Sequence, residues 1–243
     1  MRRYLLMYIG VCARNDYEWP EVDFHAIASA PIQLLKTMSH SSPVMYEKAR
    51  AINPDIQFIV RLYDPSFGVD HHPSPEDFVG QLIPVIRALK NYTSFFQIHN
   101  EPNHPAGYEG WRSSSDYALN FKHWYLETLT ILRIEFPGLK VGFPGLAIPH
   151  NDLEWLAICK EAIEESDWLG VHAYWQYDNH LHLDWGLRFY HYVDTLGYVP
   201  EMHILEGGNS NMQNNIPLPE TQMADQLMEF YAKCNLSGII QSV

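Results

Sequence analysis

Two glutamates follow apolar segments that are typical of buried strands. Glu101 comes after residues 94–99 and precedes Pro102, and Glu206 comes after residues 202–205 and precedes two glycines. The proline predicts extended backbone at Glu101, because its ring restricts the residue before it. Hydrolysis of a glycosidic bond uses two carboxyl groups with different roles, so this pair indicates glycosidase chemistry. Taken alone, each glutamate could instead cap a helix or pair with an arginine.

Short apolar segments alternate with longer amphipathic ones along the whole chain. The predicted strands are residues 5–11, 32–37, 57–62, 94–99, 140–145, 168–173, 202–205 and 237–242. The predicted helices are residues 43–51, 74–90, 116–135, a segment from residue 151, 183–196 and 219–233. This alternation predicts a parallel sheet. Eight strands in 243 residues favour an α/β fold with one (β/α)8 TIM barrel domain over residues 1–243. An open doubly wound sheet is the alternative, but no glycine-rich phosphate loop follows the first strand.

A barrel would bring the carboxyl ends of its strands to one face, where such enzymes build their active sites. The residues that follow the predicted strands are mostly polar. We therefore predict that Glu101 and Glu206 are catalytic and share a cavity. The residues predicted to contact substrate there are Asn100, His172, Tyr174, Trp175, Arg61, Asp64, His104 and Asn209.

Two segments carry a resemblance to a known group of enzymes. Residues 96–103, Phe-Gln-Ile-His-Asn-Glu-Pro-Asn, resemble the Asn-Glu-Pro signature of clan A glycoside hydrolases, which are retaining (β/α)8 enzymes. Residues 170–175, Gly-Val-His-Ala-Tyr-Trp, are similar to the clan's sixth strand, and families 39 and 5 look most similar overall. The resemblance spans nearly the whole chain in order and spacing.

The resemblance implies a role for each catalytic residue. Glu101 would be the general acid/base, Glu206 the nucleophile, and Tyr174 or His172 a contact of the nucleophile. It also implies an arginine near the nucleophile, for which Arg61 is a candidate, with pairing to an acid as an equal alternative. The implied activity is retaining hydrolysis of β-linked oligo- or polysaccharides without a cofactor.

The end of the predicted eighth strand departs from the clan. Members often carry an aromatic residue there, usually tryptophan, as a sugar platform, whereas residues 238–243 read Gly-Ile-Ile-Gln-Ser-Val. We expect either a barrel trimmed after its eighth strand or a piece of a longer parent. A barrel that binds carbohydrate but does not hydrolyse it is therefore the first alternative function.

Thirteen histidines raise a second alternative, a metal-dependent hydrolase that uses His172, His180 and His182. A zinc site needs three or four converging ligands with supporting contacts. His180 and His182 stand in a polar segment where exposure to solvent is usual, so we predict no metal. We expect the loops after the third, fourth and sixth strands to form walls of the substrate cleft.

The composition restricts the partners of the chain. Its net charge of −13 predicts no binding to nucleic acid, since an acidic protein repels phosphates. No apolar run approaches the length of a membrane span. Three widely spaced cysteines fit a reducing compartment, which slightly favours the cytoplasm. Residues 1–13 vaguely resemble a signal peptide, which leaves secretion as the alternative, but we predict that they form the first strand. Aromatic residues, 14% of the chain, fit either core packing or sugar platforms.

Overall fold

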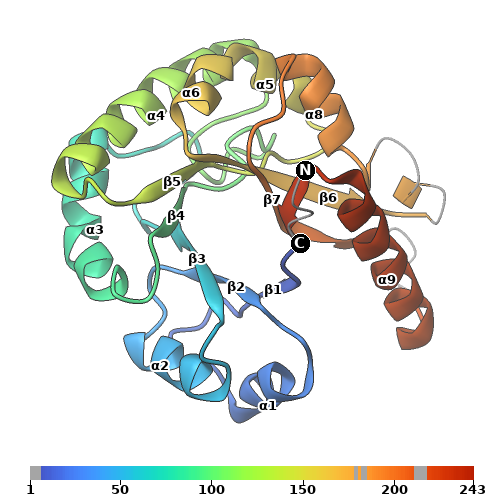
Figure 1. The fold of residues 1–243 in the computed structure, drawn as a ribbon. Helices are drawn as coiled ribbons and strands as arrows, with labels where there is room; N and C mark the ends of the chain where they lie inside the picture. Colours follow the sequence, from blue (N-terminus) through green and yellow to red (C-terminus); the bar gives the residue numbers. More distant parts are fainter. Residues whose placement is uncertain (1–6, 178–179, 182–184, 211–217) are drawn as a thin grey trace, which may run out of the picture.

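The computed structural model describes residues 7–177, 180–181, 185–210 and 218–243. Eight parallel strands lie side by side in chain order around a ring (Figure 1). They are β1 (Gly10–Cys12), β2 (Leu34–Met38), β3 (Gln57–Leu62), β4 (Phe95–Ile98), β5 (Lys140–Phe143), β6 (Trp168–Trp175), β7 (Met202–Asn209) and β8 (Ile240–Ser242). The predicted α/β fold, a (β/α)8 barrel, is confirmed.

The ring closes between its first and last strands. Tyr8 and Ser242 form a parallel bridge beside β1 and β8. Gly10 N donates to Val243 O at 2.5 Å, and Val243 N donates to Tyr8 O at 3.0 Å. These backbone hydrogen bonds join the two ends of the sheet, so the barrel wall is continuous at this level.

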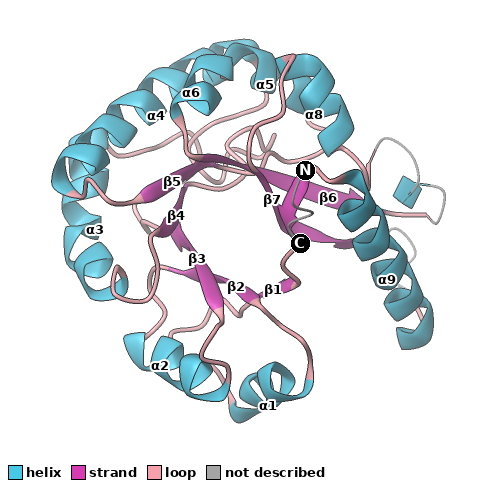
Figure 2. Cartoon of the chain, in the orientation of Figure 1, coloured by secondary structure: helices cyan, strands magenta, loops and turns pink. Residues whose placement is uncertain are grey.

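The helices surround the ring on its outer side (Figure 2). They are α1 (Glu21–Ser29), α2 (Pro43–Ile52), α3 (Pro75–Leu89), α4 (Ser115–Glu135), α5 (Asp152–Ile158), α6 (Lys160–Glu165), α8 (Phe189–Leu196) and α9 (Glu220–Ser237). Among the described residues, none of these helices combines the length and the apolar character needed to cross a membrane.

Local sequence signals explain where several elements begin. Ser74 Oγ accepts a hydrogen bond from Asp77 N at 3.1 Å and so caps α3, and Pro75 occupies the first turn of that helix. Pro84 lies inside α3, which continues past it to Leu89.

Two apolar clusters hold the layers together. The larger one joins the helices to the outer face of the strands. The smaller one consists of Leu34, Ile59, Trp168 and Leu205, which come from four different strands. Because neighbouring residues of these strands belong to the larger cluster, the smaller cluster lies inside the ring.

Some element boundaries differ from the predictions. The first strand is Gly10–Cys12 rather than residues 5–11, of which residues 5 and 6 lie outside the described part. The last strand starts at Ile240, because α9 continues to Ser237. Helix α1 was not predicted, since its short polar-rich segment has no clear apolar stripe. The predicted helix 183–196 is shorter in the described residues and is α8.

Candidate active site

Glu101 follows β4 in a turn with an unusual backbone. His99 and Glu101 have φ of 69° and 41°, in the left-handed region that non-glycine residues seldom adopt. The extended backbone predicted for Glu101 from Pro102 is therefore wrong. The turn is fixed by a hydrogen bond from Glu101 N to Gly145 O at 3.0 Å and by one from His104 N to Glu101 O at 2.9 Å. Such strained conformations cost about 1–3 kcal/mol each and gather at functional sites.

Glu206 lies within β7 and is brought to the site by an irregularity in the sheet. The register between β6 and β7 shifts between Val171 and His172, so that His172 stands beside Glu206. Bulges of this kind redirect side chains near active sites. The shift therefore places the sixth-strand histidine next to the seventh-strand glutamate.

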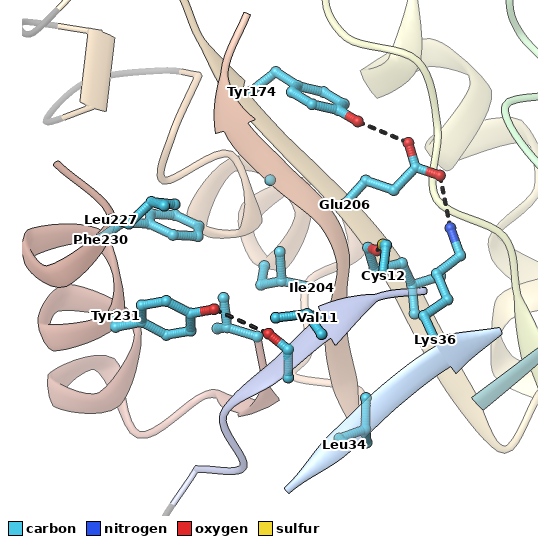
Figure 3. Close-up of a pocket in the computed structure, with 14 residues that line it drawn as sticks. Val11, Cys12, Leu34, Lys36, Tyr174, Ile204, Glu206, Leu227, Phe230 and Tyr231 are labelled. Carbon is cyan, nitrogen blue, oxygen red and sulfur yellow. Dashed lines mark hydrogen bonds and ion pairs between the residues drawn. The ribbon is translucent and has the colours of Figure 1, made fainter. Parts of the chain in front are cut away.

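Both carboxylate oxygens of Glu206 accept hydrogen bonds, as Figure 3 shows. Lys36 Nζ of β2 donates to Oε1 at 2.6 Å, and Tyr174 OH of β6 donates to Oε2 at 2.8 Å. Burial by itself would raise the pKa of Glu206. Electrostatic interaction with His172, the Lys36 ammonium and the hydrogen bonds from Lys36 and Tyr174 outweigh burial and hold the pKa of Glu206 well below its usual range. Glu206 is therefore ionised at neutral pH.

His172 stands between the two glutamates. It is fully buried, its Nδ1 lies 2.8 Å from Glu101 Oε1, and its Nε2 lies 3.7 Å from Glu206 Oε1. Gly145 makes this position available, because a Cβ atom there would lie 2.1 Å from His172 Cδ2. Gly145 also binds Glu101 through its carbonyl, so one glycine positions both the histidine and the acid.

The two glutamates and His172 form one compact cluster. One ligand atom of each residue, including a carboxylate oxygen of Glu101 and one of Glu206, lies within 4.8 Å of the others. The two predicted catalytic carboxylates therefore meet in space, although 105 positions separate them in the sequence.

Asn100 is held next to Glu101 by buried neighbours. Gln97 Nε2 donates to Asn100 Oδ1 at 3.4 Å, and Asn100 N donates to His99 Nδ1 at 2.8 Å. His99 Nε2 then donates to Glu109 O at 2.7 Å, which assigns the proton of this ring to Nε2. Burial lowers the pKa of His99, consistent with a neutral ring.

Three of the predicted contact residues have partners within the protein. Trp175 is fully buried, and its Nε1 donates to Gln226 Oε1 of α9 at 2.9 Å. Asn209 Nδ2 donates to the same oxygen at 2.8 Å. Asp64 is buried at 2% exposure and accepts a hydrogen bond from Ser66 N at 2.8 Å in the turn after β3. These hydrogen bonds hold the side chains of Trp175, Asn209 and Asp64 in the fold, and their contact with substrate stays a prediction.

The side chains of the remaining two predicted residues, Arg61 and His104, have partners outside the cluster of Glu101, His172 and Glu206. Arg61 pairs with Glu109, the alternative left open by the sequence, and it lines a cavity together with Glu206. His104 stacks on the exposed Tyr108 with ring centroids 5.6 Å apart, and His150 lies 5.8 Å from it. These rings belong to the loops after β4 and β5.

Lys36 was not predicted from the sequence, and it takes the place beside Glu206 that was expected for Arg61. The available signal was a lysine within an apolar strand, where an unpaired ammonium would be costly to bury. Cys12, whose thiol lines two cavities next to Glu206, was also not predicted.

Two cavities adjoin Glu206, on the side of β1 and β2. One has a volume of about 360 Å³ and opens among Arg14, Asn15, Arg61 and Met38 at the polar mouth of the barrel. The other has a volume of about 300 Å³ and extends between β1 and β7 toward α9 (Figure 3). Cys12, Lys36, Tyr174 and Glu206 line both cavities.

Among the described residues, Glu101, His172 and Glu206 have the spacing to share a metal ion. The Lys36 ammonium, 2.6 Å from Glu206, would repel a divalent cation, and Tyr174 occupies the second oxygen of Glu206. The cluster therefore fits a metal poorly. His180 stacks on Trp185, 5.1 Å between ring centroids, rather than joining this cluster, and His182 lies outside the described residues.

No protein-family profile matches the sequence, and no curated protein matches it. Solved structures with a similar fold include several glycoside hydrolases. A GH39 β-xylosidase from Caulobacter crescentus has a TM-score of 0.66 at 14% identity, covering 100% of this chain and 62% of that protein. A GH39 enzyme from Xanthomonas axonopodis pv. citri has a TM-score of 0.61 at 13% identity, with coverage of 100% and 58%.

A family 51 α-L-arabinofuranosidase from Bifidobacterium longum is also similar, with a TM-score of 0.56 at 11% identity, covering 84% of this chain and 49% of that protein. The chain thus spans between 49% and 62% of the length of these three proteins. Identities this low show a shared fold alone, the (β/α)8 barrel.

Proposed function

We propose that this protein is a retaining O-glycoside hydrolase of clan A type that cleaves β-linked oligo- or polysaccharides. The observation that carries the proposal is the pair of carboxylate oxygens, one from Glu101 and one from Glu206, within 4.8 Å of each other. Retaining enzymes place their carboxyl groups about 5–5.5 Å apart, whereas inverting enzymes need about 6.5–9.5 Å to admit water. The short separation supports retention.

In the first step Glu206 is the nucleophile and Glu101 is the acid. A Glu206 oxygen attacks the anomeric carbon and forms a glycosyl ester, while the bond to the leaving oxygen breaks and takes the proton of Glu101. The low pKa of Glu206, which Lys36 and Tyr174 maintain, keeps the attacking group ionised.

In the second step Glu101 is the base. Its carboxylate takes a proton from water, the water oxygen attacks the anomeric carbon, and the bond to Glu206 breaks. The sugar leaves with its original anomeric configuration, and Glu101 is protonated again. His172 holds the Glu101 side chain at 2.8 Å through both steps.

The neighbouring residues supply substrate contacts in this proposal. Asn100, next to the acid, binds the hydroxyl beside the reacting carbon, and Arg61 contacts the sugar at the mouth of the cavity. His104 and Tyr108 form an exposed aromatic surface on the loop after β4. We expect a neutral carbohydrate as partner and no nucleic acid.

The activities of structurally similar proteins guide the choice of substrate. Two of them are GH39 enzymes, one a β-xylosidase, and another is an exo-β-1,3-glucanase of family 128. We therefore propose a relation to family 39 in preference to family 5, and β-xylosides and β-glucosides as the first substrates to examine.

The test is hydrolysis of 4-nitrophenyl β-D-xylopyranoside and β-D-glucopyranoside, followed by that of β-linked oligosaccharides. Glu206→Ala should lower kcat at least about a thousandfold. Added azide should then restore turnover and give the α-glycosyl azide, because azide attacks from the face that Glu206 has vacated. Glu101→Ala with azide should instead give the β-glycosyl azide, since it replaces water in the second step. NMR of the products distinguishes the two anomers.

The control is Glu127→Ala, a change of an exposed glutamate on α4 that should leave turnover unchanged. Retained activity in Glu206→Ala would contradict the assignment of the nucleophile. Binding of oligosaccharides without turnover would favour the non-hydrolysing barrel. Loss of activity in a chelator, with recovery on adding zinc, would favour the metal-dependent alternative.

A further inference from the structure

Three aromatic rings lie together on the loops that follow β4 and β5, and we call them the three-ring surface. The His104 and Tyr108 rings are stacked, with their centroids 5.6 Å apart and their planes at 25°. The His150 ring meets the His104 ring edge-on, with centroids 5.8 Å apart. Tyr108 is 66% exposed, so its ring is accessible from solvent.

Buried Asn103 holds the two loops together. Its Oδ1 accepts a hydrogen bond from Ala147 N at 2.7 Å, and its Nδ2 donates to Ala147 O and His150 O, both at 2.8 Å. His104 Nδ1 accepts a hydrogen bond from Ala106 N at 3.2 Å, which orients this ring. The rings are therefore arranged before any ligand binds, and a prearranged surface loses little entropy on binding.

The fold makes little use of Tyr108. Within the described residues, it belongs to neither apolar cluster, and its ring packs on one other ring, that of His104. A single exposed aromatic side chain is common on protein surfaces and needs no function. The position of this ring relative to Glu101 is what indicates a role.

The three-ring surface is joined to Glu101 by short connections. His104 N donates to Glu101 O at 2.9 Å, which closes a four-residue turn whose end Cα atoms lie within about 7 Å of each other. Glu101 N donates to Gly145 O at 3.0 Å, so the segment that leads to His150 also starts beside Glu101. Both loops that carry the rings therefore begin at the proposed acid.

The cavities beside Glu206 lie on the other side of the site. In the described part of the chain, the residues that line them include none from the loops after β4 and β5. β4 and β5 lie across the ring from β1 (Figure 1). A retaining enzyme bonds the glycone to its nucleophile and protonates the leaving oxygen with its acid, so the leaving group extends on the side of the acid. We therefore expect the leaving group at the loops after β4 and β5.

We infer that the three-ring surface binds the leaving sugar of the substrate and, once that sugar has left, an acceptor sugar. This inference rests on the proposed function. Aromatic rings pack against the apolar face of a pyranose, while the imidazole nitrogens and the phenol hydroxyl form hydrogen bonds with its hydroxyl groups. The ligand class is thus an uncharged β-linked sugar.

An acceptor sugar at this surface gives the protein a second activity, glycosyl transfer. The acceptor hydroxyl oxygen bonds to the anomeric carbon, its proton passes to Glu101, and the ester bond to Glu206 breaks. This step differs from hydrolysis only in that a sugar hydroxyl replaces water. Transfer should therefore compete with hydrolysis when an acceptor sugar is present.

Binding at the three-ring surface is measured first, without turnover, in Glu206→Gln protein that carries isotope-labelled histidine. The probes are β-1,4-xylobiose, cellobiose and laminaribiose, each compared with the methyl β-glycoside of its monosaccharide. The NMR signals of His104 and His150 are identified by their absence in His104→Gln and His150→Gln. At least one disaccharide should shift both signals at a concentration about tenfold below that of its methyl glycoside, and Tyr108→Ala should abolish this difference.

The kinetic test compares two leaving groups. The leaving group of a β-glycosyl fluoride is a single atom that does not reach the rings, whereas that of a disaccharide is a whole sugar. Tyr108→Ala should lower kcat/KM for the disaccharide about tenfold more than for the fluoride, the loss expected for one aromatic contact. With the fluoride as donor and a methyl β-glycoside as acceptor, Tyr108→Ala should also lower the ratio of transfer to hydrolysis about tenfold.

The matched control is Tyr17→Ala. Tyr17 is 62% exposed and lies in the loop after β1, across the ring from the three-ring surface. This variant should keep both ratios of the unmodified protein. His150→Ala should move both ratios in the same direction as Tyr108→Ala, and this second variant keeps the test valid if one of the two fails to fold.

The outcomes separate the two proposals. If no disaccharide shifts the His104 and His150 signals, or if Tyr108→Ala and Tyr17→Ala give equal ratios, the leaving-sugar inference is overturned even where glycosides are hydrolysed. If a disaccharide shifts both signals and Tyr108→Ala abolishes the difference while no glycoside or fluoride is hydrolysed, sugar binding at the three-ring surface stands and the hydrolase proposal fails.

Discussion

Lys36 and Tyr174 hold the two oxygens of Glu206, and their contacts set the charge of the proposed nucleophile. Glu101 and Glu206 were predicted from the sequence because each has a local signal, an apolar strand followed by proline or glycine. Lys36 was missed because its partner lies 170 positions away, a distance that no local pattern reports. The ionisation of Glu206 therefore depends on contacts between residues that are far apart in the sequence.

Replacing the lysine should change the pH dependence of the reaction. A lowered pKa keeps Glu206 ionised as the pH falls, so the acidic side of the kcat/KM profile should not report Glu206 in the unmodified protein. In Lys36→Met the pKa of Glu206 should rise by about 1–3 units, and an acid limb should appear or move to higher pH. The profile with a 4-nitrophenyl glycoside measures this.

The matched control is Lys48→Met, which removes a lysine paired with Glu21 on the surface between α1 and α2. Its profile should coincide with that of the unmodified protein. An unchanged acid limb in Lys36→Met would show that the ammonium does not govern the charge of Glu206.

Tyr174→Phe removes the hydrogen bond to the other oxygen of Glu206. Hydrogen bonds to charged groups contribute about 1.5–3 kcal/mol, so kcat/KM should fall roughly ten- to a hundredfold if the bond is tighter in the transition state. Tyr190→Phe, at a half-exposed position of α8, serves as the control and should retain full activity. Equal kinetics of the two variants would exclude Tyr174 from the reaction.

At the scale of elements, the order and type of the strands were predictable while their ends were not. The apolar alternation located all eight strands, because strands buried on both faces have a continuous apolar signal. The ends of β1 and β8 depend on how the two strands meet, and the left-handed turn at Glu101 depends on its bond to Gly145. Contacts between distant segments decided these features.

Two glycines near the end of β5 offer a matched pair of tests. A Cβ atom at Gly145 would lie 2.1 Å from His172, and one at Gly142 would lie 2.2 Å from the Trp168 ring. Overpacking costs about 1–3 kcal/mol, so alanine at either position should lower the melting temperature. Only Gly145→Ala should also lower kcat/KM of the folded protein, by about tenfold or more. The added methyl group would displace the His172 ring and break its hydrogen bond with Glu101. Equal kinetics in both variants would contradict this positioning role.

At the scale of the whole molecule, the sequence predicted a closed barrel but not the means of closure. β8 meets β1 through backbone hydrogen bonds among Tyr8, Gly10 and Val243. The closure of the ring therefore depends on contacts between segments at opposite ends of the sequence, which no local pattern predicts.

Deleting residues 241–243 should open the ring and lower the stability of the whole barrel. Tyr8 N donates to Gln241 O at 2.9 Å, and two further backbone hydrogen bonds join Gly10 and Tyr8 to Val243. At about 1 kcal/mol each, their loss amounts to about 3 kcal/mol, or a fall in melting temperature of roughly 6–12 °C for a chain of this size. Ser242→Ala removes only the hydrogen bond between His203 Nδ1 and Ser242 Oγ, at 2.7 Å. This variant should lower the melting temperature by roughly 2–4 °C. Calorimetry compares the two, and an equal fall in both would mean that the β1–β8 backbone bonds add nothing to stability beyond the contact of one side chain.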